Sequence, residues 1–156
     1  MAIRKRQSVN KLTYVEHVVR ITKAETYYSF SAEREWYAEK AYRDMHHLTL
    51  TGHFLSPQKL AHQQVSLSLI GDRDCLAKEK QSRDVASATS IGELSLRADR
   101  NQFLGVLPQA SLWDLAFGID RGVIKYARLN GAQMRGRVVK VNSASFVTAV
   151  DHSELD

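Results

Sequence analysis

The sequence predicts a mainly β protein, an antiparallel β-sandwich or alternatively a flattened barrel, with one short amphipathic helix near residues 109–120. Two observations support this fold class. Short segments of alternating apolar and polar residues recur along the chain with turn residues between them, which is typical of half-buried antiparallel strands. Helical periodicity is clear only once, whereas a parallel α/β fold needs helices between its strands. We therefore expect about eight or nine short strands.

The composition is that of an ordinary globular chain forming a single domain, 1–156. Of the 156 residues, 44% are apolar and 25% are charged, which is close to the average for soluble proteins. Apolar runs are too short for a membrane-spanning helix, and the basic N-terminus lacks the apolar stretch of a secretory signal. The single cysteine, Cys75, excludes an intramolecular disulfide framework. We expect a cytoplasmic protein with no membrane association.

The first part of the chain begins with a polar, basic segment, residues 1–11, which predicts a loose arm. β-Branched and aromatic residues then predict one strand over 14–21 and a second over 26–31. The short interval 23–25 between them suits a hairpin. The next segment, 31–45, is rich in Ala, Glu and Lys and is compatible with either a helix or an irregular loop.

Clearer alternation follows. Residues 46–54 predict a half-buried strand in which Gly52 marks a bulge, and Ser56-Pro57 ends it. Residues 65–69 predict another strand that stops at Gly71-Asp72. The charged and small polar residues 72–90 predict a long surface loop.

In the second half, residues 94–98 and 102–107 predict two strands, and then the period changes to that of a helix. The spacing i, i+3, i+4, i+7 is typical of one apolar helix face. Ser111 and Asp114 resemble a capping box, and Gly122 is a natural stop. The residues of the apolar face are Leu112, Leu115, Ala116 and Ile119.

The same helix carries a second apolar face formed by Trp113 and Phe117, four residues apart. Two apolar faces mean that the helix is either buried against two elements or uses one face at a subunit interface. Burial within the monomer is the default interpretation. Trp113 and Phe117 are the candidate interface residues.

The dipeptide Asn130-Gly131 predicts a two-residue hairpin turn between the alternating segments 123–129 and 132–138, because such turns need positive φ at both positions. The resulting register gathers one tyrosine and three arginines on one face and sets Tyr126 opposite Arg135 for a cation–π contact. A final strand runs toward Val150. The residues of this cationic face, our candidate binding residues, are Tyr126, Arg128, Arg135 and Arg137.

The net charge of +5 permits binding of nucleic acid or phosphate through this cationic face but does not require it. The alternative is a solvent-facing sheet whose long side chains shield apolar neighbours. A single tyrosine is also fewer aromatic residues than a base-stacking surface needs.

The sequence contains no catalytic motif, so no catalytic residue, cofactor or metal is assigned. His46 and His47 point to opposite faces of the predicted strand, and His53 lies about 20 Å from His47 at ~3.3 Å per residue. Those positions do not form a metal site by themselves, although cross-strand neighbours are not excluded. No Gly-x-Ser-x-Gly sequence or glycine-rich phosphate loop is present.

The leading hypothesis is a non-catalytic intracellular β-domain that acts through protein contacts and forms a homo-oligomer, through Trp113, Phe117 and its sheet edges. Two alternatives stay open. One is nucleic-acid or phosphate binding by the cationic face, and the other is a small-molecule or enzymatic site between the sheets.

Overall fold

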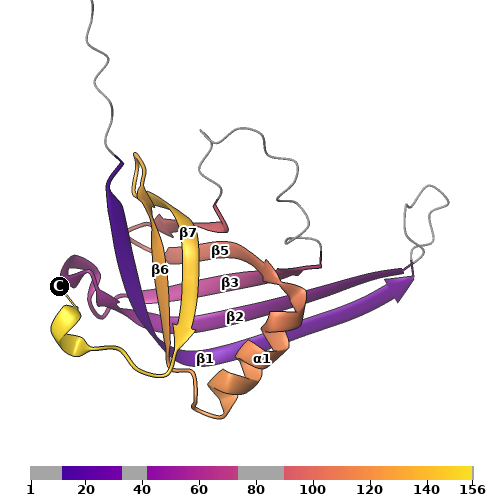
Figure 1. Cartoon of the computed structure of the whole chain (residues 1–156). Coiled ribbons are helices and arrows are strands. Elements are labelled where there is room, and N and C mark those ends of the chain that lie inside the picture. The colour runs from indigo at the N-terminus through magenta and orange to yellow at the C-terminus, as the bar shows by residue number, and fades with distance from the viewer. Residues whose placement is uncertain (1–11, 33–41, 74–89, 156) are drawn as a thin grey trace, which may run out of the picture.

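The chain forms a closed barrel of seven strands, as the computed structural model of residues 12–32, 42–73 and 90–155 shows (Figure 1). The strands follow one another around the barrel in the order β1-β2-β3-β5-β4-β7-β6. All neighbours are antiparallel except β3 and β5, which are parallel. No helix in the described part of the chain is long and apolar enough to cross a membrane. The elements are β1 Tyr14–Ala32, β2 Tyr42–Ser56, β3 Gln64–Asp72, β4 Gly92–Leu96, β5 Asn101–Pro108, α1 Gln109–Asp120, β6 Tyr126–Gln133 and β7 Val138–Val147, with 3-10 turns at Gln58–Leu60 and His152–Glu154.

The closed barrel corrects the prediction of a sandwich and agrees with the flattened-barrel alternative. Closure depends on β1, which pairs with β2 over Val18–Ala32 and with β6 over Tyr14–Arg20. The register of β1 against β2 shifts twice, near Val18 and near Thr22. Such bulges bend a strand and increase its twist, so one strand can belong to both sides of the barrel.

The predicted hairpin at 23–25 is wrong, because Lys23, Ala24 and Glu25 pair with β2 inside one continuous strand. The bulge expected at Gly52 lies across from it, at Thr22 of β1. A Cβ atom on Gly52 would lie 2.2 Å from the carbonyl oxygen of Arg20, so glycine is needed there for close strand contact.

The ambiguous segment 31–45 is strand at both of its ends. Residues 31–32 belong to β1, and residues 42–45 belong to β2, so the helix alternative is wrong at those positions. Residues 33–41, the arm 1–11 and most of the predicted loop 72–90 lie outside the described residues, as does Cys75.

The predicted two-residue turn at Asn130-Gly131 is also wrong. Both residues lie within β6, and Asn130 pairs with Ser143 while Gly131 pairs with Val141 across a bulge. A Cβ atom on Gly131 would lie 2.3 Å from the carbonyl oxygen of Lys140. This glycine therefore permits close strand contact. Positive φ is needed elsewhere, in the turn between β6 and β7.

The real turn spans residues 134–137. Gly136 has a φ of 77° and Arg137 a φ of 64°, and the N–H of Met134 donates to the carbonyl oxygen of Val138 at 2.7 Å. A hairpin does join β6 to β7, but its turn begins four residues further along the chain, and its second strand is Val138–Val147 in place of the predicted 132–138. Every cross-strand pair of the predicted register changes as a result.

The helix prediction is confirmed at 109–120. Its capping-box prediction is wrong, because the N-cap is Pro108 and no side chain caps the first turn. Gly122 ends the helix as expected, with a φ of 71° and its N–H donating to the carbonyl oxygen of Ile119 at 2.9 Å.

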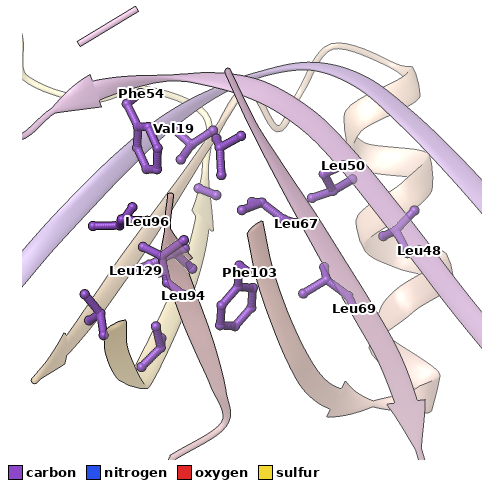
Figure 2. Packing of buried hydrophobic residues seen from close by; sticks show 14 of the residues in the cluster. Val19, Leu48, Leu50, Phe54, Leu67, Leu69, Leu94, Leu96, Phe103 and Leu129 are labelled. Carbon is purple, nitrogen blue, oxygen red and sulfur yellow. The ribbon is translucent and has the colours of Figure 1, made fainter. Parts of the chain in front are cut away.

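Inward-facing side chains from all the strands fill the barrel (Figure 2). Phe103 and Leu94 lie near its centre. Helix α1 covers one end (Figure 1), and its Leu112 and Leu115 belong to the same buried cluster. Three turns, at residues 57–63, 97–100 and 134–137, surround the opposite end, which we call the open end. The fully buried apolar residues include Leu48, Leu50, Phe54, Leu67, Leu69, Leu94, Phe103, Leu112 and Leu129.

Candidate functional site

Helix α1 turns an aromatic face to the outside of the barrel. Trp113 is 43% exposed and Phe117 is 58% exposed, and their ring centroids are 6.4 Å apart. The default interpretation, burial within the monomer, is therefore wrong for these two side chains. Large apolar groups exposed side by side are unusual on a monomer and mark a contact surface more often than chance.

The aromatic surface continues onto β1 and β2, which run on beyond the other strands (Figure 1). We call this two-stranded extension of β1 and β2 the ribbon. Tyr28 pairs with His46, and Ala32 pairs with Tyr42, so these side chains share one side of the ribbon. The rings of Phe30 and Tyr42 stack at 5.5 Å and 14°, and Tyr28 lies 6.1 Å from Trp113. We call the exposed residues Tyr28, Phe30, Tyr42, Trp113 and Phe117 the aromatic face.

His46 lies beneath this face and is fully buried. Its ring centroid is 4.3 Å from that of Trp113, and the ring of Tyr28 meets it edge-on at 6.0 Å. Neither ring nitrogen has a hydrogen-bond partner among the described residues. Burial lowers the pKa of His46, and the nearby carboxylate of Asp44 opposes that shift. The imidazole therefore packs as a neutral aromatic group.

Asp44 links three elements next to the aromatic face. Its Oδ2 accepts hydrogen bonds from Gln109 of α1 at 2.7 Å and from Arg73 after β3. The hydroxyl of Tyr28 donates to the same oxygen at 3.4 Å. Partial burial works to raise the pKa of Asp44, but the hydrogen bonds from Gln109 and Arg73 outweigh it and lower the pKa. Ionised Asp44 thus fixes the start of α1 against the ribbon.

Beside the aromatic face, one edge of β1 has no partner among the described strands. Its pairing with β6 ends at Arg20, and the last backbone bond on that side runs from the N–H of Ile21 to the carbonyl oxygen of Lys125, at 2.9 Å. Beyond Ile21, β2 is the only described strand that pairs with β1. A strand edge of this kind offers free N–H and C=O groups to another chain.

A groove separates this strand edge from α1. Its volume is about 400 Å³, and β1 forms one wall while α1 forms the other. The lining residues that matter here are Thr22, Ala24, Thr26, Trp113, Ala116 and Phe117. Its lining combines the threonines Thr22 and Thr26 with apolar side chains of α1, so the groove suits a polypeptide side chain or strand.

Two described cations near the aromatic face are paired with carboxylates. Lys23 pairs with Glu25 at 2.8 Å, and Arg73 pairs with Asp44. The exposed carboxylate of Asp114 adds negative charge on α1. Lys23 and Arg73 are thus matched by carboxylates, which does not favour a polyanionic partner.

The four candidate binding residues do not form one face. Tyr126 is the first residue of β6, and Arg135 lies in the turn beyond the last, Gln133, which is itself about 23 Å from Tyr126 at ~3.3 Å per residue. The predicted cation–π contact between them is therefore wrong. Arg128 instead binds Glu16 through Nε at 3.1 Å and Nη2 at 2.8 Å. Arg137 lines the open end.

The histidines do not converge. His46 and His47 face opposite sides of the ribbon, as the strand prediction requires. His17, which is almost fully buried, packs 5.9 Å from Phe54. Among the described residues, no group of three His, Cys, Asp or Glu side chains has the geometry to hold a metal ion.

No family model, curated protein or solved structure matches this chain.

Sequence reasoning did not single out the part of the aromatic face that lies on the ribbon. Tyr28 and Phe30 are two residues apart in the predicted strand 26–31, and this spacing alone puts both rings on one side. Tyr42 was placed in the ambiguous segment. Only the register of β1 against β2 brings it onto Phe30.

Proposed function

We propose that this chain is a non-catalytic intracellular domain that acts through protein contacts and self-associates through the aromatic face and the adjoining edge of β1. The observation that supports this most is the position of five exposed aromatic side chains beside a strand edge with which no described strand pairs. Aromatic residues are enriched at the energetic centres of protein interfaces. Strand edges add main-chain hydrogen bonds to such contacts. The single cysteine of the sequence fits a reducing compartment.

The occupant that fits this surface best is a second copy of the chain. Antiparallel pairing of β1 with β1 of another copy is a two-fold arrangement, in which the same patch serves both partners. It satisfies the free backbone groups of both edges at once and brings the two aromatic faces together. The balanced charge, with Lys23 paired to Glu25 and Arg73 to Asp44, lets two identical surfaces approach without strong repulsion.

A nucleic-acid partner at this surface is less well supported. Single-strand binding combines stacking aromatic residues with a positively charged groove. The aromatic residues are present, but the nearby groove is lined by one lysine, Lys23, and one aspartate, Asp120. A polyanion would have no excess of positive charge to neutralise there.

Sedimentation velocity over a concentration series tests self-association. We expect a concentration-dependent dimer, weakened more than tenfold by Trp113→Ser combined with Phe117→Ser, since buried aromatic anchors contribute about 2 kcal/mol or more each. Leu104→Ser is the matched control, because Leu104 is equally exposed, at 52%, but projects from the outer wall of β5. A monomer at high micromolar concentration, or equal loss in the control, would contradict the proposal.

A further inference from the structure

A hollow of about 900 Å³ lies at the open end of the barrel. Its volume is within the range of small-molecule sites, roughly 300–1,000 Å³. Three turns that are distant in sequence form its walls, at residues 57–63, 97–100 and 134–137, together with the chain that enters β1 at Thr13. It is separate from the aromatic face, which lies at the end covered by α1.

The hollow is strongly cationic. Its lining includes four basic side chains from all three turns and one acidic side chain, Asp99. Within the described ranges, none of the four makes a side-chain hydrogen bond or ion pair. Like charges held together repel one another unless an anion binds between them. The basic residues are Lys59, Arg97, Arg100 and Arg137.

The backbone of the open end is held in an unfavourable conformation at two places. His62 has a φ of 68° and Arg137 a φ of 64°, and these are the only described residues other than glycine with positive φ. Both lie in turns at this end. The carbonyl oxygen of Arg137 accepts a hydrogen bond from the N–H of Leu96 at 2.9 Å, which fixes the turn. Strain of this kind is concentrated at ligand sites, where it holds side chains in position.

Between the cations, the hollow offers carboxamide groups and a few aliphatic side chains. Asn101 is nearly buried, and its Nδ2 donates to Gln63 Oε1 at 3.3 Å and to the carbonyl oxygen of Gln64 at 3.1 Å. Leu60 and Leu96 contribute apolar surface. None of the described residues that line the hollow is aromatic, so this lining lacks the stacking surface that single-stranded nucleic acids use.

We propose that the open end binds a small molecule that carries two or more phosphate groups, of the size of a nucleotide. Guanidinium groups bind phosphate oxygens in pairs, and three arginines from two turns surround one volume of suitable size. The carboxamides of Gln63 and Asn101 then contact the polar part of the ligand, and the aliphatic side chains contact its apolar part. This site is independent of the self-association proposed above.

Isothermal titration calorimetry of the full chain with inorganic tripolyphosphate and with a nucleoside triphosphate, at low and at physiological salt, tests this proposal. We expect one ligand per chain and at least about tenfold weaker binding in Arg97→Ala/Arg100→Ala. Arg121→Ala/Lys125→Ala is the matched control, because it removes two exposed cations from the other end of the barrel. Circular dichroism checks that each variant is folded, and Arg137→Gly provides a second, independent loss of one cation.

Absence of binding by both ligands at low salt would overturn the proposal, as would equal weakening by the two double variants. An oligothymidylate that binds much more tightly than tripolyphosphate, and loses that affinity in Arg97→Ala/Arg100→Ala, would replace the small molecule with nucleic acid. Sedimentation of the same variants separates the two proposals, because the dimer contact lies at the opposite end and is expected to stay unchanged.

Discussion

The imidazole of His46 lies 4.3 Å from the indole of Trp113, centroid to centroid, with the two planes inclined by 36°. Trp113 is half-exposed, whereas His46 is fully buried. The imidazole therefore supports the exposed indole from below and connects the aromatic face to the interior of the barrel. This arrangement requires a neutral ring, because a charged imidazolium without a hydrogen-bond partner is costly to bury.

Replacing His46 is expected to reduce the sensitivity of the fold to acid. The pKa of folded His46 is lowered by burial, so its protonation favours the unfolded chain as the pH falls below about 6.5, the unperturbed value. The variant His46→Leu has no proton to bind and should lose less free energy of unfolding between neutral and mildly acidic pH. Urea denaturation at both pH values measures this, and an unchanged pH dependence would show that His46 does not titrate on unfolding.

His17 makes a second and larger contribution to the acid sensitivity of the fold, with the same sign as that of His46. Burial, with the nearby charge of Lys59, lowers the pKa of His17 to about 4. Its contribution to stability is complete above the unfolded pKa of about 6.5 and is lost as the pH falls toward 4; at pH 5 the loss is about 2 kcal/mol.

The variant His17→Gln, which does not titrate, measures this contribution. Between about pH 7.5 and pH 5 its free energy of unfolding should fall by about 2 kcal/mol less than that of the natural chain. An equal fall in the free energy of unfolding of both proteins would contradict the lowered pKa of folded His17.

Two glycine-to-alanine substitutions distinguish the barrel register from a turn at Asn130-Gly131. Gly131→Ala should cost about 3 kcal/mol or more, because its Cβ would lie 2.3 Å from the carbonyl oxygen of Lys140. Gly136→Ala meets no atom within 4 Å, so it should cost only the ~1 kcal/mol of a positive φ. Thermal denaturation ranks the two variants, and a reversed order would favour the turn at Asn130-Gly131.

Arg137→Gly is expected to stabilise the fold while it weakens anion binding. The φ of Arg137 is 64°, which glycine adopts without strain, so we expect a gain of about 1 kcal/mol in the free energy of unfolding. Arg135→Gly is the control in the same turn. The φ of Arg135 is not positive, so that variant should be destabilised by about 0.5–1 kcal/mol through added freedom in the unfolded chain. Chemical denaturation of both variants measures the contrast, and a loss of stability in Arg137→Gly would remove the argument from strain.

Part of the candidate site was predictable from local sequence. The helical period of Leu112, Leu115 and Ile119 places Trp113 and Phe117 together on another face, and the structure has that arrangement. The exposure of this second face was not predictable, because a helix pattern does not tell which faces the rest of the chain covers. The cations of the open end were not predictable as a group, since Lys59, Arg97 and Arg137 come from separate turns.

The sequence by itself determined where several strands and the helix lie, because alternation and helical periodicity depend on neighbours within a few residues. Alternation predicted the strand cores at 46–54 and 65–69, and a 3.6-residue period predicted α1 at 109–120. Tertiary structure decided closure of the barrel, the length of β1 and the place of the last hairpin turn. Those features depend on pairing across long separations, as between Glu16 and Arg128, which lie 112 residues apart and still form an ion pair. Glycine at position 131 suits a tight turn and a close strand contact equally well, and only its neighbour Lys140 in the folded barrel selects between them.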